Sequence, residues 1–113
     1  MKAEGHLDKV RKIKKSIELL RGDEENVEAI VEICYGLAHH LIAYGLETRF
    51  GEHKDTHQGV PTLLRQHGQS EIAIHFERLD TLRIGRWYGG KGNGEVVEES
   101  LKIIEAIERW AME

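Results

Sequence analysis

The segment Val27-Glu-Ala-Ile-Val-Glu-Ile-Cys-Tyr-Gly-Leu-Ala-His-His-Leu-Ile-Ala-Tyr-Gly45 decides the fold of this 113-residue chain. Its apolar residues recur every three or four positions, which is the pattern of an amphipathic α-helix. This stripe comprises Val27, Ile30, Val31, Cys34, Leu37, Ala38, Leu41 and Gly45. Further apolar residues widen it to a second contact surface, and small residues such as Gly36 and Gly45 let another helix approach closely. We predict one long helix over 24–50 that lies at the centre of a bundle or forms a dimer face.

Four further segments show the same helical spacing of apolar residues, at 5–21, 60–67, 71–88 and 95–112. No segment alternates apolar and polar residues as a half-buried strand does. The length allows one domain with one core. We therefore predict an all-α fold, an antiparallel up-and-down bundle of four to five helices in a single domain over 1–113.

Turn and capping residues separate these segments. Gly22 is predicted to end the first helix, and Asp23 to cap the second. Asp55 or Thr56 is predicted to cap the short helix 60–67, and Ser70 to cap the helix that follows.

The composition favours a soluble protein. The net charge is −4, and the N-terminus has no apolar targeting segment. The single cysteine, Cys34, excludes an intrachain disulfide, and its apolar neighbours predict a buried, inert thiol. We expect a cytoplasmic protein that does not engage a membrane.

Two cationic runs stand against this acidic background. Residues 9–15 hold five Lys and Arg residues on the first predicted helix, typical of a solvated face and also of a nucleic-acid surface. Arg78, Arg83, Arg86 and Lys91 form the second run, which continues into a glycine-rich loop. Local positive potential of this kind collects anions. A plain helix–helix connection is the alternative, because the loop follows a helix and lacks the Gly-Lys-Ser/Thr ending of a P-loop.

The strongest candidate constellation combines His57 with Arg83, Arg86 and Tyr88. An arginine fork beside a phenol can hold a phosphate and orient a sugar or base. An imidazole from another loop adds proton transfer near neutral pH. The alternative is structural: Arg83 pairs with a Glu, and Tyr88 packs at a helix end.

The seven histidines raise the question of a metal site. His53 and His57 are four residues apart with Asp55 between them, and His39 and His40 lie on the preceding helix. Zinc requires three or four convergent ligands, and this sequence has neither a His-Glu-x-x-His motif nor a Cys pair. We expect no metal and no cofactor.

Three motifs occur in a characteristic order. They are Cys34-Tyr-Gly-Leu-Ala-His-His40 running on to Phe50, Thr56-His-Gln-Gly-Val60, and Leu79-x-x-Leu-Arg83-x-x-x-x-Tyr88. With this order and the helical pattern, the chain over roughly 24–112 resembles the HEPN domain family (higher eukaryotes and prokaryotes nucleotide-binding). It is most similar to the small free-standing archaeal and bacterial branch.

The resemblance implies a helical bundle and a homodimer whose two motif-bearing helices face one cleft. Many members are metal-independent ribonucleases, often toxins that a minimal nucleotidyltransferase neutralises. Their catalytic motif is Arg, four to six residues, then His. Arg83 matches this arginine, but Tyr88 follows it and no histidine occurs after His75. Members of the branch commonly have Ala-Asp-Tyr where this chain has Arg86-Trp87-Tyr88, so the predicted pocket is more cationic and favours binding over cleavage.

Three functions follow as hypotheses. The leading one is a non-catalytic or weakly catalytic protein of the toxin–antitoxin type that binds nucleotide or RNA phosphate in a dimer cleft. In it Arg83 and Arg86 hold the anion, Trp87 and Tyr88 pack on base or sugar, and His57 and Lys91 close the rim. The second is a metal-independent endoribonuclease toxin that uses Arg83 with His57. The third is a structural subunit whose helix 24–50 docks a minimal nucleotidyltransferase.

Overall fold

The computed structural model describes residues 1–54, 58–88 and 94–113, and for 86–88 and 94 it describes the backbone alone. The described chain forms α1 (Ala3–Leu20), the 3-10 turn η1 (Glu24–Asn26), α2 (Val27–Phe50), α3 (Val60–Gln66), α4 (Ser70–Tyr88) and α5 (Gly94–Met112). It holds no strand in these ranges. The predicted all-α bundle is confirmed.

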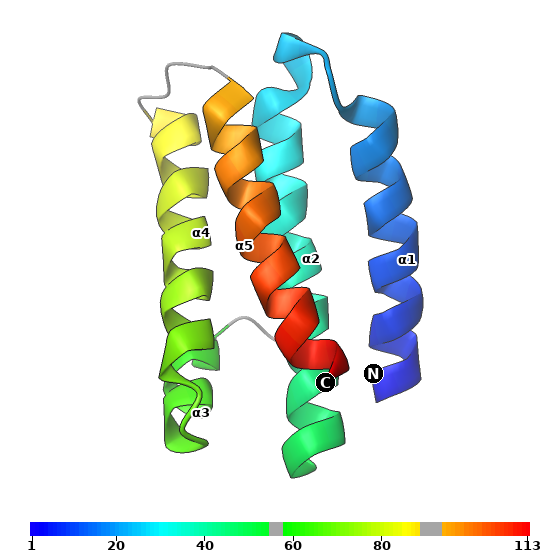
Figure 1. Cartoon of the computed structure of the whole chain (residues 1–113), viewed down its shortest axis with the longest axis vertical. Helices are drawn as coiled ribbons and strands as arrows, with labels where there is room; N and C mark the ends of the chain where they lie inside the picture. The colour runs from blue at the N-terminus through cyan, green and yellow to red at the C-terminus, as the bar shows by residue number, and fades with distance from the viewer. Residues whose placement is uncertain (55–57, 89–93) are drawn as a thin grey trace.

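Helix α2 is the centre of the bundle. Helices α1 and α4 pack against it from either side, and α5 crosses it on a third side (Figure 1). The short helix α3 packs on α4. Because α2 has neighbours on three sides, apolar residues lie around most of its circumference, and its Leu37, Leu41 and Leu46 are buried. The predicted central position of this helix is confirmed.

Local chemistry ends the helices close to the predicted positions. Gly22, with φ of 94°, follows α1, and the Asp23 carboxylate accepts a hydrogen bond of 2.9 Å from the Glu25 backbone N–H. Gly51, with φ of 70°, terminates α2 in the left-handed conformation that glycine adopts without strain.

Two of the predicted caps are corrected. The residue at the N-cap of α3 is Gly59, in the left-handed conformation, so the cap is neither Asp55 nor Thr56, which lie outside the described residues. The next helix begins at Ser70 itself, one residue earlier than predicted. Gly59 immediately precedes Val60 with a positive φ, and no side chain caps the start of α3.

A close helix contact joins the ends of α2 and α5. A Cβ added to Gly45 would clash with the Trp110 ring, so only glycine lets the indole approach the α2 backbone this closely. The Trp110 Nε1–H donates to Gln69 Oε1 at 2.8 Å, and the Arg49 guanidinium lies 5.0 Å from the Trp110 ring centroid. One aromatic residue therefore ties α5 to α2 and to the connection before α4.

The segment Glu24–Phe50 is long and apolar enough to cross a membrane by length and composition. Most of its apolar window is buried inside the bundle, as in the core helix of a soluble protein.

Candidate functional site

Arg83 lies at the surface between α4 and α2 and contacts two carboxylates. Its Nε and Nη2 donate to Asp80 Oδ1 at 3.0 and 2.6 Å, one turn earlier on α4. Its Nη1 lies 3.5 Å from Glu32 Oε1 on α2. The Arg83 side chain is 25% exposed and the Glu32 side chain 42%, so this ion pair lies at the surface.

An aromatic pair fixes the other side of this arginine. The Arg83 Cζ lies 4.4 Å from the Tyr35 ring centroid, and the Tyr35 ring stacks on Phe76 at 4.9 Å. Phe76 and Arg83 are seven residues apart on α4, which is about 10.5 Å along a helix. The ring-to-ring distance and the guanidinium-to-ring distance together account for most of that span, so the Tyr35 ring lies between Phe76 and Arg83. The guanidinium is held in one orientation before any ligand arrives.

The charges around Arg83 determine its protonation. Burial acts to lower the pKa of Arg83, but the hydrogen bond and charge of Asp80, with the charge of Glu32, raise it above its usual value. Burial raises the pKa of the Tyr35 phenol, and the charges of Asp80 and Glu32 raise it further against the opposing effect of Arg83. Near neutral pH the pair is therefore a guanidinium cation against a neutral phenol.

The described part of the second cationic run is charge-balanced. Arg78 Nε donates to Glu99 Oε2 on α5 at 2.7 Å, and this bond raises the pKa of Arg78 and lowers the pKa of Glu99. Arg83 forms ion pairs with Glu32 and Asp80, so the predicted structural alternative, in which Arg83 pairs with a Glu, describes its observed contacts. The described part of the run therefore supplies no excess of positive charge.

The predicted site residues are placed to different extents. Arg86, Trp87 and Tyr88 occupy the last turn of α4, directly after Arg83 on the same helix, and their side chains lie outside the description. His57 and Lys91 also lie outside the described residues. The structure brings Arg83 together with residues of α2.

Glu32 and Tyr35 are site residues that sequence reasoning missed. Both come from α2, which we interpreted only by its apolar stripe. The signal was present: Glu32 and Tyr35 are three residues apart on one face, and both fall outside that stripe. Helical spacing also places their partner Asp80 one turn before Arg83.

Three of the histidines lie close together on α1 and α2. His6 of α1 meets His40 of α2, with 2.8 Å between their Nδ1 atoms, and the His39 ring centroid lies 6.2 Å from that of His6. His53 lies near Glu47, at 3.6 Å. Within residues 1–54, 58–88 and 94–113, no group of three or more His, Cys, Asp or Glu side chains is arranged to hold a metal ion.

Cys34 is fully buried in the core, as predicted. Burial raises the pKa of its thiol to about 12, so the nucleophilic thiolate is absent near neutral pH.

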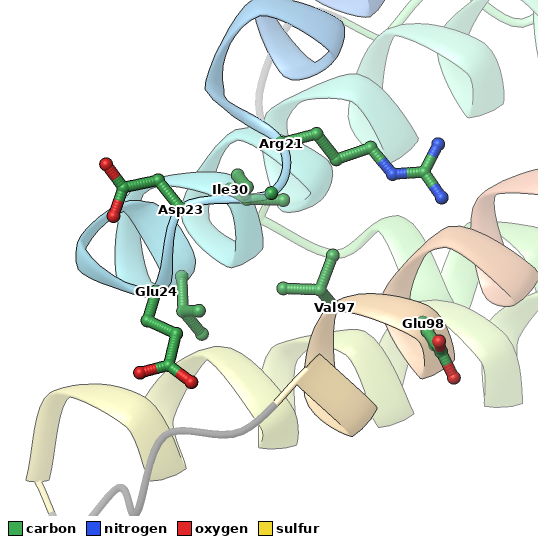
Figure 2. Close-up of a pocket in the computed structure, with 8 residues that line it drawn as sticks. Arg21, Asp23, Glu24, Ile30, Val97 and Glu98 are labelled. Carbon is green, nitrogen blue, oxygen red and sulfur yellow. The ribbon is translucent and has the colours of Figure 1, made fainter.

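A separate hollow of about 240 Å³ lies where the turn between α1 and α2 meets the start of α5. Figure 2 shows the side chains of Ile30 and Val97 in this hollow, with the carboxylates of Asp23, Glu24 and Glu98 around it. Arg21 also lines this hollow, so its rim combines three carboxylates with one guanidinium.

The fold and this site define a class: an all-α bundle with an arginine-centred polar cluster on the α2–α4 face. A scan against family models gives no match, and neither the curated proteins nor the solved structures contain a match.

Proposed function

We propose that this chain is a HEPN-like protein that binds nucleotide or RNA phosphate, non-catalytically or with weak catalysis, in the cytoplasm. The toxin–antitoxin context, with a minimal nucleotidyltransferase as partner, belongs to the same proposal. It rests on the resemblance of the motifs, in which Arg83 matches the motif arginine.

The observation that supports phosphate binding is the orientation of the Arg83 guanidinium. Asp80 and the Tyr35 ring hold it, while its Nη1 lies 3.5 Å from the partly exposed Glu32 carboxylate. A preorganised guanidinium loses little conformational entropy when an anion binds. A phosphate oxygen that displaces the Glu32 carboxylate would accept charge-assisted hydrogen bonds from Nη1 of Arg83.

The same cluster favours binding over cleavage. Arg83 with Asp80 and Glu32 carries a formal charge of −1, so Arg86 and Lys91 must supply the positive potential that attracts the ligand. The raised pKa of Tyr35 makes this phenol a poor general base near neutral pH. Catalysis therefore depends on His57, the one candidate base of the second hypothesis.

The proposed homodimer is supported by an open strip on α2. Nine residues, or two and a half helical turns, separate Gly36 from Gly45, so Gly36 faces away from α5. A Cβ added to Gly36 would meet nothing within 4 Å, and Ala29, Glu32 and Ile33 on the same side are partly or fully exposed. A second copy that packs here would place two Arg83 residues along one cleft.

Thermal-shift titrations with ATP, AMP and a short RNA test the proposal. A ligand at 100 times its dissociation constant adds about 2.7 kcal/mol to the free energy of unfolding. We expect Arg83→Gln to abolish the shift and Glu32→Gln to enlarge it, because the second change removes the carboxylate that competes with the phosphate.

Arg65→Gln is the matched control, since Arg65 of α3 forms an exposed ion pair with Glu77 of α4. A shift that survives Arg83→Gln removes the site. RNA from the same samples is run on a gel: cleavage without metal that disappears in His57→Ala would assign the endoribonuclease function instead.

The structural-subunit function is favoured by the same open strip, because α2 exposes small and apolar residues to which a partner helix fits. In that case the pure protein ignores nucleotides and RNA, and binding of the nucleotidyltransferase is lost in Gly36→Arg. Absence of any ligand-induced shift, with this loss, would replace the binding proposal.

A further inference from the structure

The cationic run on α1 is not used by the Arg83 site, and the structure shows that this charge is segregated. Residues 2–21 hold seven Lys and Arg against three Asp and Glu, a formal charge of +4. The rest of the chain holds nine against seventeen, a charge of −8, which gives the overall −4. The excess of positive charge in this protein therefore lies in residues 2–21, that is, in α1 and its two flanking residues Lys2 and Arg21, at one side of the bundle (Figure 1).

Three lysines supply the accessible part of this charge. Arg11 pairs with Asp8 at 3.2 Å, and Lys14 pairs with Glu108 of α5 at 2.8 Å. Lys9, Lys12 and Lys15 are exposed and form no ion pair with any carboxylate in the described part of the chain.

The lysines face a defined side of the bundle. Lys14 marks the side of α1 that faces α5, because it bonds Glu108. Lys9 and Lys12 precede Lys14 by five and two residues, which places them roughly 140° and 160° around the helix from it. They therefore lie on the side of α1 that faces away from α5.

An exposed apolar side chain accompanies the lysines. Leu19 is 87% exposed and lies two turns after Lys12 on the same face. With Lys14, Lys15 and Glu18 it lines a shallow, mostly apolar hollow of about 440 Å³. A flat nucleobase or a ribose packs on such a surface, while the neighbouring lysines contact phosphates.

We infer that the face of α1 formed by Lys9, Lys12, Lys15 and Leu19 is a second anion-binding surface that holds the backbone of a single-stranded RNA. The inference rests on the proposed function, because it makes a polynucleotide rather than a mononucleotide the ligand. Helix α2 separates α1 from α4, and two packed helix spacings amount to about 20 Å. An oligonucleotide spans this distance from Arg83, whereas AMP contacts Arg83 alone.

The test compares a 12-nucleotide RNA with AMP across a salt series. The variant is the triple substitution of Lys9→Gln, Lys12→Gln and Lys15→Gln. Each phosphate contact in a single strand contributes about −0.7 to the slope of log K against log salt, so three lost contacts reduce the slope by about 2. We expect this reduction for RNA and an unchanged affinity for AMP.

The matched control is the triple substitution of Lys54→Gln, Lys102→Gln and Arg109→Gln, which changes the net charge equally and lies outside α1. Circular dichroism checks that both triple variants fold. An equal loss of slope in both would show that net charge alone acts and would overturn the inference.

The remaining outcomes separate the two proposals. RNA binding that Arg83→Gln weakens but the α1 variant leaves intact overturns the α1 surface and keeps the proposed function. RNA binding that depends on the α1 lysines but not on Arg83 keeps the surface and overturns the Arg83 site. A wild-type protein that binds no RNA overturns this inference, and polyglutamate binding that depends on the same lysines and exceeds RNA binding reassigns the face to an acidic protein.

Discussion

Arg83 and Cys34 show how environment determines what a residue can do. The Arg83 guanidinium is fixed by Asp80 and Tyr35, and its Nη1 lies beside the partly exposed Glu32 carboxylate. Cys34 sits one position from Tyr35 on α2 but points into the core, where no charged form is stabilised. Neighbouring positions on one helix thus hold a candidate ligand contact and an inert thiol, because helical geometry turns them to different surroundings.

The Cys34 thiol gives a prediction on alkaline stability. Its folded pKa of about 12 lies above its unfolded value, so its contribution to stability is complete below the unfolded pKa and is lost as the pH rises toward 12. Between about pH 9 and about pH 11 the free energy of unfolding should fall more steeply in the wild type than in Cys34→Ala, by up to about 1.4 kcal/mol per pH unit.

Urea denaturation at several pH values measures this difference. Equal slopes for the two proteins would contradict the predicted burial of the thiol. Alkylation by iodoacetamide at pH 8 gives an independent check, since the native thiol should react only when urea exposes it.

At the scale of the elements, α2 is the helix on which most of the others pack. Its apolar residues surround it, so α1, α4 and α5 all pack on the same helix. The α2–α5 contact depends on Gly45, because the Trp110 ring occupies the space of a Cβ. Glycine in a helix interior costs about 1 kcal/mol relative to alanine, and this contact offsets the cost.

Gly45→Ala is therefore expected to destabilise the protein despite the better helix propensity of alanine. Forcing a methyl group against the Trp110 ring should lower the free energy of unfolding by about 1–3 kcal/mol. Gly85→Ala on α4 is the control: a Cβ there meets nothing within 4 Å, so this change should raise stability by up to about 1 kcal/mol. Urea unfolding compares the two, and a stabilised Gly45→Ala would show that α5 does not approach α2 so closely.

The order and type of the helices could be predicted because apolar spacing reports them directly. The predicted range 24–50 corresponds to η1 and α2, and 95–112 corresponds to α5 within one residue. The caps of α3 and α4 were predicted less well, since the conformation of Gly59 follows from how the chain enters α3 rather than from local sequence. Of the candidate site, Arg83 was named but Glu32 and Tyr35 were not, because they reach Arg83 only when α4 packs on α2.

At the scale of the whole molecule, one face of the bundle is left open. Helix α5 covers α2 on one side, and the opposite side carries the strip around Gly36, where a Cβ would meet nothing within 4 Å. Arg83 of α4 contacts Glu32 of this strip. The proposed dimer would use this side of the molecule.

Sedimentation equilibrium tests the dimer. The chain mass is 12.9 kDa, so a homodimer has twice this mass. Gly36→Arg should dissociate it without unfolding the bundle, because the new side chain points to open space in a single copy. Thr48→Arg, an exposed position near the other end of α2, should leave the mass unchanged. A monomeric wild-type protein at all concentrations would contradict the prediction.

The sequence by itself determined the helices, their approximate ends and the burial of Cys34, and it left open whether α2 is central in the bundle or forms a dimer face. These features depend on periodicity and local chemistry, which each segment carries alone. Only the tertiary structure decided which charges neutralise one another: Arg83 meets Glu32 across two helices, Arg78 meets Glu99, and the lysines of α1 stay exposed. The physical reason is that an ion pair between two helices depends on how the helices pack and on their rotation about their axes. The sequence of one helix alone determines neither the packing nor the rotation.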